Sequence, residues 1–130
     1  MPVLVINLNC ALVFILQADL YAPAFELTGL PGQTAIRSVG ILFVMWNIPY
    51  IFALIDPRVH RASLLSAWLM QLTGVVGESW LFLTIPELPV ARVSILRFVI
   101  FDAVGLLFLV AAYVLVLSGK SNAQPTYHRQ

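Results

Sequence analysis

Two long apolar stretches of this chain contain side chains that can carry charge or form strong hydrogen bonds. The first, over residues 67–80, holds the amide of Gln71 and the carboxyl group of Glu78. The second holds Arg97 and Asp102. Charged groups inside a membrane are energetically costly, so they usually face the interior of the protein and mark a functional site. These four side chains are therefore the first candidates for a binding site.

The rise of an α-helix predicts the depth of these groups. At ~1.5 Å per residue, Glu78 lies ~10 Å below the outer end of its helix, and Arg97 lies ~9 Å below the same surface in the next helix. These depths predict an ion pair between Glu78 and Arg97, with Asp102 deeper, at ~16 Å. Trp46 and Asn47 lie ~15 Å into another apolar stretch, where they can line the same cavity. The candidate ligand-binding residues are Glu78, Arg97, Asp102, Gln71, Asn47 and Trp46.

Glycines beside these polar groups favour a second, purely structural interpretation. Gly74 and Gly77 precede Glu78, and Gly105 follows Asp102 by one helical turn. Membrane helices associate through such small residues and through hydrogen bonds between helices. The polar groups would then hold the helices in register and bind no ligand. The sequence leaves both interpretations open.

Signatures of catalysis, of metal binding and of nucleic-acid binding are absent from the sequence. His60 lies in a polar turn and His128 near the carboxyl end, so the two histidines form no metal-binding pair. Cys10 is the only cysteine, which excludes an internal disulfide and a Cys-x-x-Cys redox pair. There is no glycine-rich phosphate loop, and no basic stripe that would bind nucleic acid. We therefore expect no enzyme activity, no cofactor, no metal and no nucleic-acid partner.

The composition indicates a protein surrounded by lipid. Of 130 residues, 61% are hydrophobic and only 10% are charged, whereas soluble domains average about 25% charged residues. The apolar runs are several-fold longer than a β-strand, which predicts an all-α fold. At ~20 residues per spanning helix, the chain has room for four spans and short connections.

The positions of prolines, glycines and charges define these elements. We expect one four-helix transmembrane bundle over residues 1–118, with Pro49 producing a kink in the second helix. The first residues lack a positively charged segment, so we expect a retained helix and no secretory signal. The predicted spans cover about residues 3–20, 35–55, 62–85 and 91–117, and a polar cytoplasmic tail follows at 119–130.

The distribution of Lys and Arg predicts the orientation of the bundle. Arg58, Arg61, Lys120 and Arg129 lie on the side of the two termini. The opposite side has two basic residues, so the positive-inside rule places both termini in the cytoplasm.

Arg37-x-x-Gly40, which opens the second apolar helix after an outer loop, resembles a feature of the DoxX-like group of small bacterial membrane proteins. The length and the four-helix layout resemble that group over most of the chain, although the amino end lacks the basic, glycine-rich opening of many members. The resemblance implies a multi-pass protein of the bacterial cytoplasmic membrane, sometimes associated with redox enzymes. It assigns no residue to a function.

Three functions are consistent with this pattern. The first is a protein without its own catalysis, acting as an accessory or assembly subunit of a larger membrane complex or as a homo-oligomer, because nearly every residue belongs to a span or a tight turn. The alternative is an outward-opening protein that binds or transports a lipophilic small molecule or a proton-coupled solute through an intramembrane Glu/Arg/Asp cluster. The second alternative is an intramembrane enzyme acting on a lipid, with Glu78 or Asp102 as acid or base. The expected partners are the lipid bilayer and other membrane subunits or a second copy.

Overall fold

The computed structural model describes residues 2–85 and 88–118, and every regular element in this part of the chain is helical, which confirms the all-α prediction. The predicted tail and the turn residues 86–87 lie outside the described residues. The elements are α1 (Pro2–Leu16), α2 (Ala18–Tyr21), the 3₁₀ helix η1 (Ala22–Phe25), α3 (Gly29–Trp46), α4 (Ile48–Ile55), α5 (Arg61–Thr84) and α6 (Pro89–Ser118).

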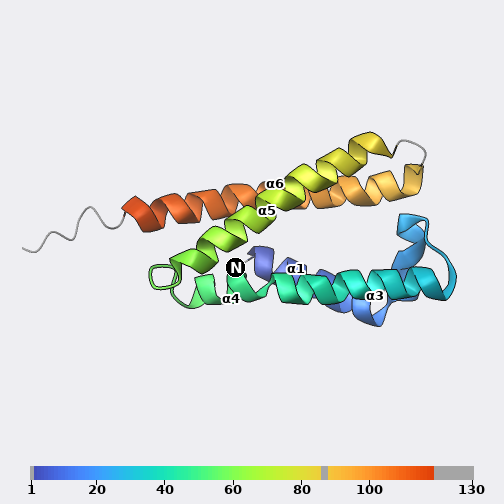
Figure 1. Ribbon diagram of the computed structural model, residues 1–130, viewed down its shortest axis with the longest axis horizontal. Helices are drawn as coiled ribbons and strands as arrows, with labels where there is room; N and C mark the ends of the chain where they lie inside the picture. Colours follow the sequence, from blue (N-terminus) through green and yellow to red (C-terminus); the bar gives the residue numbers. More distant parts are fainter. Residues whose placement is uncertain (1, 86–87, 119–130) are drawn as a thin grey trace, which may run out of the picture.

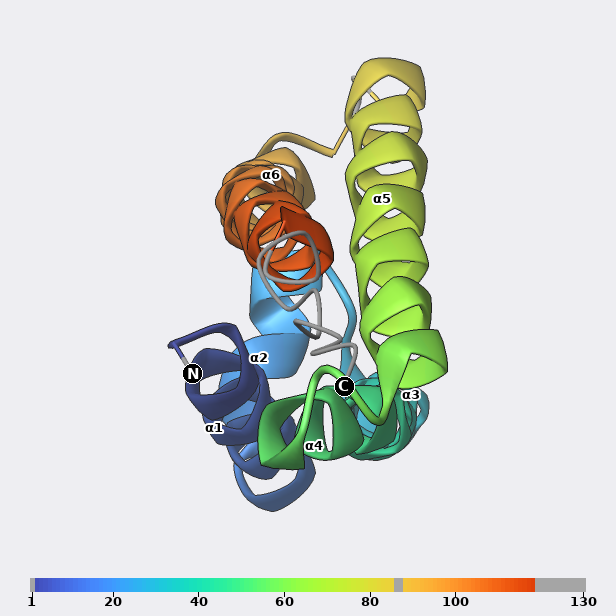
Figure 2. The same ribbon diagram turned by 90° about the vertical axis from the view of Figure 1, so that its left-hand side faces the viewer.

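The helices form two antiparallel pairs (Figure 1). α1 packs against α3, and α5 packs along α6. The two pairs are joined at opposite ends of the molecule, because α4 contacts the beginning of α5 and η1 contacts α6. Figure 2 shows the molecule from the end at which α4 turns into α5.

Two helical segments are long and apolar enough to cross a membrane. They are Gly29–Ile55, formed by α3 and α4 together, and Pro89–Val116 of α6. A third span results if the bent pair Pro2–Leu16 and Ala18–Phe25 is counted as one. α5 has the length for a span and is not among these segments. Its polar side chains lower its apolarity, and they include Gln71, Thr73 and Glu78.

The first apolar segment is sharply bent, whereas a continuous helix was expected over residues 3–20. The chain turns by 99° between α1 and the segment that follows Gln17. Ala18 and Ala22 are thereby buried together with Phe14 in a cluster that faces α3. The bend at Gln17 thus coincides with tight packing of these small side chains, and no proline or glycine lies at the bend itself.

The second span begins at Gly29, earlier than the expected residue 35. Gly29 has a φ of +63°, a left-handed conformation that glycine adopts without strain. Pro31 lies in the first helical turn, where a missing N–H leaves no hydrogen bond unmade. Further along, the helical pattern is interrupted at Asn47, because Pro49 has no N–H to donate to the carbonyl of Met45.

The polar turn before α5 is organised by Asp56. Its Oδ1 accepts hydrogen bonds from the backbone N–H groups of Arg58 at 2.8 Å and Val59 at 3.0 Å. Donation from Val59 and then from Arg58 lowers the pKa of the Asp56 carboxyl group. The turn is therefore held by a carboxylate outside the membrane-spanning segments.

At the other end of the molecule, Glu26 connects the first half of the chain to the last helix. Its Oε1 accepts hydrogen bonds from the backbone N–H groups of Val90 at 2.9 Å and Ala91 at 3.4 Å, in the first turn of α6. The hydroxyl group of Ser94 donates to the carbonyl of Ala24 at 2.7 Å. The segment around η1 thus caps α6 from outside that helix.

We predict that Glu26→Ala lowers the free energy of unfolding by about 1 kcal/mol, the typical effect of losing an N-terminal cap. Glu26→Gln keeps an oxygen acceptor on a side chain of the same length, so it should lose less. Reversible unfolding in mixed micelles, followed by circular dichroism, measures both variants. Equal losses for Ala and Gln would contradict a capping role, because both variants share the left-handed backbone of residue 26.

Candidate functional site

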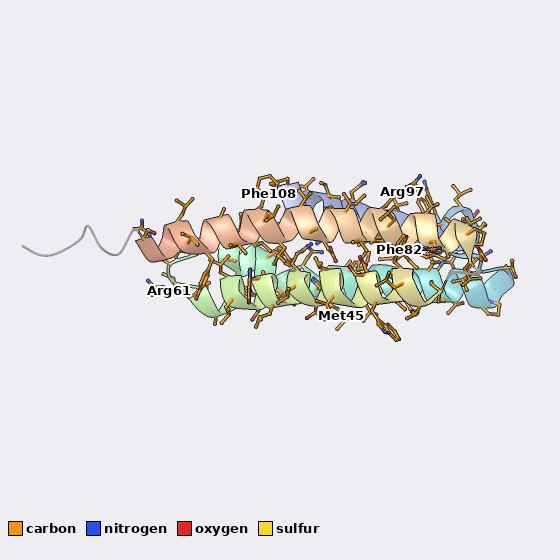
Figure 3. All side chains as sticks on the ribbon, turned by 90° about the horizontal axis from the view of Figure 1, so that it is seen from above. Met45, Arg61, Phe82, Arg97 and Phe108 are labelled. Atoms are coloured by element: carbon orange, nitrogen blue, oxygen red, sulfur yellow. The ribbon has the colours of Figure 1, made fainter. Side chains whose placement is uncertain are left out.

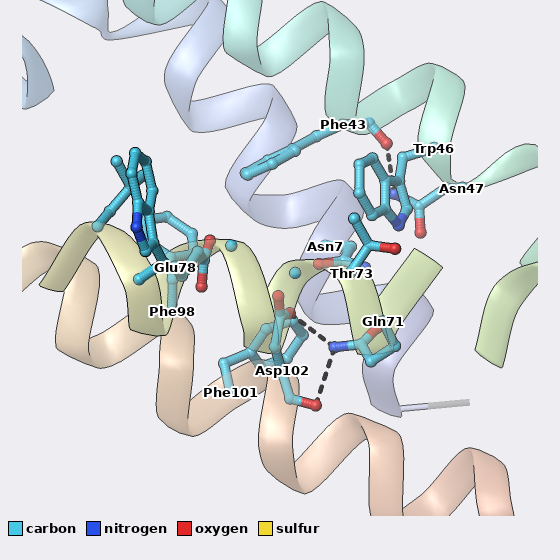
Figure 4. A pocket seen from close by; sticks show the side chains of 14 residues that line it. Asn7, Phe43, Trp46, Asn47, Gln71, Thr73, Glu78, Phe98, Phe101 and Asp102 are labelled. Carbon is cyan, nitrogen blue, oxygen red and sulfur yellow. Dashed lines mark hydrogen bonds between the residues drawn. The ribbon is translucent and has the colours of Figure 1, made fainter. Parts of the chain in front are cut away.

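A cavity of about 400 Å³ lies between the two helix pairs and is lined by residues of α1, α3, α5 and α6 (Figure 4). Its volume is within the range of ~300–1,000 Å³ typical of small-molecule sites. Aromatic side chains form much of its wall, namely Phe43, Trp46, Trp80, Phe98 and Phe101. Its polar side chains are those of Asn7, Asn47, Gln71, Thr73, Glu78 and Asp102.

Five of the six candidate residues from the sequence line this cavity. Helical spacing explains how α5 and α6 present them. Gln71 and Glu78 are seven residues apart and lie on one face of α5, two turns from each other. Phe98 and Asp102 are four residues apart and share a face of α6. The five are Trp46, Asn47, Gln71, Glu78 and Asp102.

Arg97 does not belong to the cavity, and the ion pair expected between Arg97 and Glu78 is wrong. The Arg97 side chain is exposed, and Figure 3 shows it on the side of α6 away from α5. The equal depths of the two residues suggested the pair, but depth alone ignores direction around the helix axis. At ~100° per residue, Arg97 projects about 140° away from Asp102, which faces α5.

Gln71 connects three of the helices through hydrogen bonds. It is 1% exposed, its Nε2 donates to Asp102 Oδ1 at 2.6 Å, and its Oε1 accepts from the hydroxyl group of Tyr50. The hydroxyl oxygen of Tyr50 also lies 3.2 Å from the carbonyl oxygen of Ala67. This network joins α4, α5 and α6 at the closed end of the cavity, and it satisfies both ends of the buried Gln71 amide.

Glycines allow the helices to approach each other at this network. A Cβ atom on Gly74 would collide with Asp102 Oδ2, and one on Gly105 would lie 2.8 Å from Gln71 Nε2. These contacts match the structural interpretation of the polar groups, in which small residues and hydrogen bonds hold α5 against α6. Asp102 and Gln71 therefore have a packing role that is separate from any ligand.

Two other polar side chains have oxygen atoms without a hydrogen-bond partner. Asn47 is 0% exposed, and its Nδ2 donates to the carbonyl of Phe43 at 2.6 Å, while its Oδ1 has no partner. Glu78 Oε2 is likewise buried and unpartnered. Buried polar atoms nearly always have a partner, so each exception calls for an explanation. Both residues line the cavity, and both unpartnered atoms are acceptors.

The electrostatic character of the cavity is acidic. It contains the two carboxyl groups of Glu78 and Asp102, and no Lys, Arg or His lines it within residues 2–85 and 88–118. The same part of the chain contains no group of three or more His, Cys, Asp or Glu that could hold a metal ion. The site is thus suited to an organic cation or to another molecule that donates hydrogen bonds.

Sequence reasoning missed Tyr50 and every aromatic side chain of the wall except Trp46. Tyr50 is not among the candidate residues from the sequence, but its hydroxyl group is buried in the Gln71 network. Its spacing was an available signal, because Tyr50 follows Asn47 by three residues and so shares its helical face. Asn7 was a second signal, since it is one of only two amide side chains, with Asn9, in the otherwise apolar helix α1.

No protein family model matches this chain, and no curated protein and no solved structure is significantly similar to it. The DoxX-like resemblance therefore stays a prediction.

Proposed function

We propose that this protein binds a hydrophobic organic cation with N–H donors, such as a protonated amine, in the cavity between its two helix pairs. One observation carries the proposal. Glu78 Oε2 and Asn47 Oδ1 are both buried acceptors without a partner, and both residues line the same aromatic-walled cavity.

The chemistry of the cavity supports an amine over a neutral ligand. Hydrogen bonds between an ammonium group and a carboxylate are roughly twice as strong as those between neutral groups. Aromatic faces attract cations through the quadrupole of the ring, and the attraction grows when water is excluded. Trp46 and Phe98 supply such faces, and Glu78 supplies the carboxyl group.

The proposal includes a topology with four membrane spans and both termini in the cytoplasm of a bacterial cell. The Lys and Arg distribution supports this orientation, and the antiparallel packing of α5 on α6 supports counting α5 as a span. Because α6 is apolar enough to cross a membrane, we expect its antiparallel neighbour α5, which is of similar length, to cross together with it.

Binding of 4-phenylbutylamine to the purified protein in lipid nanodiscs tests this function. The matched neutral probe is 4-phenylbutanol, which has the same ring and chain. We predict that the amine binds about tenfold more tightly or better, because a hydrogen bond to a charged group contributes ~1.5–3 kcal/mol. Isothermal titration at neutral pH gives both dissociation constants.

Two variants make the result specific to the cavity. Glu78→Gln removes the acidic group at constant size and should abolish the preference for the amine. Arg97→Gln also changes one intramembrane charge, but it lies outside the cavity and should leave both affinities unchanged. The proposal is contradicted if amine and alcohol bind equally, or if Glu78→Gln retains the preference.

A second candidate is the accessory subunit of a larger membrane complex, favoured by the surface of α6. Only 6% of the apolar window of α6 is buried within the chain, and Arg97 is exposed on this helix. An exposed Arg97 on this otherwise apolar surface favours contact with a helix of a partner protein. Native mass spectrometry of protein purified from membranes in mild detergent separates the candidates, because a subunit brings other polypeptides along in fixed stoichiometry.

A further inference from the structure

Two sides of the cavity are closed by side chains. Next to η1, a cluster of phenylalanines fills the space between α1, α3 and α6, with ring centroids of Phe14, Phe43 and Phe98 separated by 5.9–6.2 Å. Phe43 and Phe98 belong to both the cluster and the cavity wall. On the side of α4, the Tyr50–Gln71–Asp102 network closes the cavity.

The open side lies along α5. Four cavity-lining residues of this helix are exposed, and they recur at the spacing of one helical face. α5 has no extensive contact with α3, and the two helices diverge from the turn at α4 (Figure 1). The rim of the cavity therefore runs along the length of the helix and does not lie at its end. The four rim residues are Thr73, Gly77, Trp80 and Leu81.

The surface around this rim is apolar. On α5, Leu69, Val76 and Leu83 are between 47% and 75% exposed. On the α3 side, Leu42 and Met45 are exposed as well. In a protein whose helices cross a membrane, a rim placed along the helices and surrounded by such side chains faces the hydrocarbon region and not water.

We propose that the cavity opens sideways into the bilayer between α3 and α5, and that its ligand is an amphiphile dissolved in the membrane. This inference rests on the proposed function, and it replaces the outward opening expected from the sequence. The apolar part of the ligand enters between the helices, and its ammonium group reaches the carboxyl group of Glu78. An amine dissolved only in water has no direct route to that carboxyl group.

Gly77 sets the width of this opening. It lines the cavity and is exposed, and a Cβ atom built on it meets nothing within 4 Å. A larger side chain at this position therefore begins in open space at the rim of the cavity. Gly77→Leu narrows the opening, and Gly77→Ala leaves most of it free. Val76→Leu is the matched control, because Val76 is 61% exposed and does not line the cavity.

Fluorescence quenching of Trp46, which lines the cavity, tests the opening without any ligand. Trp68→Phe and Trp80→Phe leave Trp46 as the only tryptophan, and the protein is placed in vesicles whose lipids carry bromine on their acyl chains. We expect brominated lipid to quench Trp46 and aqueous iodide to have no effect. Gly77→Leu should remove most of this quenching, while Gly77→Ala and Val76→Leu should retain it.

The rate of ligand entry provides the second measurement. Stopped-flow association of 4-phenylbutylamine should be about tenfold slower in Gly77→Leu than in Val76→Leu. Quenching by iodide, or bromine quenching that Gly77→Leu leaves intact, overturns the lateral opening. Neither outcome depends on the equilibrium preference for the amine, so failure of the opening and failure of the proposed function are distinguishable.

Discussion

Gly40→Ala is expected to lower the free energy of unfolding by about 1–3 kcal/mol, as overpacking of a tight contact does. Gly40 lies where α3 crosses α1. A Cβ atom there would lie 2.8 Å from Ile15 Cγ1, 2.9 Å from the carbonyl oxygen of Ala11 and 3.0 Å from Phe14 Cβ. The carbonyl belongs to the helix backbone and cannot rotate away, so α1 and α3 must separate.

Gly77→Ala is the matched control, because it makes the same chemical change in the middle of another helix. No atom lies within 4 Å of the added Cβ, so only the intrinsic preference of alanine for helix remains. That preference stabilises a helix by up to ~1 kcal/mol relative to glycine. The two substitutions should therefore have opposite signs in mixed-micelle unfolding followed by circular dichroism. Equal effects would show that the α1–α3 contact is looser than described.

Gln71→Met is expected to be the most destabilising change of a single polar residue. Methionine has a similar length and shape but cannot replace the hydrogen bonds of the amide. Asp102 Oδ1 would lose its donor, and the hydroxyl group of Tyr50 would lose its side-chain acceptor. Each buried polar group left without a partner costs ~1–3 kcal/mol, so the loss should exceed that of Gly40→Ala if both groups remain unpaired.

A double-mutant cycle with Tyr50→Phe separates this network from simple packing. Tyr50→Phe removes only the hydroxyl group, so it should destabilise the protein less than Gln71→Met. Once Gln71 has been replaced, the hydroxyl group has only the backbone carbonyl of Ala67 as an acceptor, and its removal should cost less still. The coupling between contacting residues in such cycles is ~0.5–3 kcal/mol. Strict additivity of the two changes would contradict a hydrogen bond between them.

The class of fold could be predicted from composition and from the length of the apolar runs. The low proportion of charged residues favours a lipid environment, and apolar runs much longer than a β-strand favour helices. The end of the second predicted span at residue 55, just before Asp56 and Pro57, agrees with the observed end of α4, whereas its start differs because Gly29, Pro31 and Gly32 belong to α3 and not to the preceding loop. The bend at Gln17 was not predicted, because no proline or glycine lies at the bend itself, and the burial of Ala18 and Ala22 beside Ile36 of α3 is visible only in the structure. Tertiary contacts decide such breaks.

The candidate site was predictable in its residue types and less so in its geometry. Polar side chains in apolar helices pointed to Gln71, Glu78 and Asp102, and the structure gathers them at one cavity. The error concerned Arg97, since a depth computed from helical rise contains no information on direction around the axis. That direction depends on which face of α6 packs against α5. The apolar residues of α6 are spread around the whole helix, so its sequence does not indicate the packed face.

The polarity of α5 also bears on how the protein is made. As the ribosome feeds the chain into the membrane, each helix enters according to its apolarity, and carboxyl and amide groups near the middle of a helix oppose entry. α5 is less apolar than α6, which follows it after a short turn and packs along it. In the four-span topology proposed above, the two helices should therefore enter together as a hairpin, with Gln71 bonded to Asp102. In that topology, a chain truncated before α6 should leave α5 outside the bilayer, so that the helix carrying Glu78 depends on the helix after it for insertion.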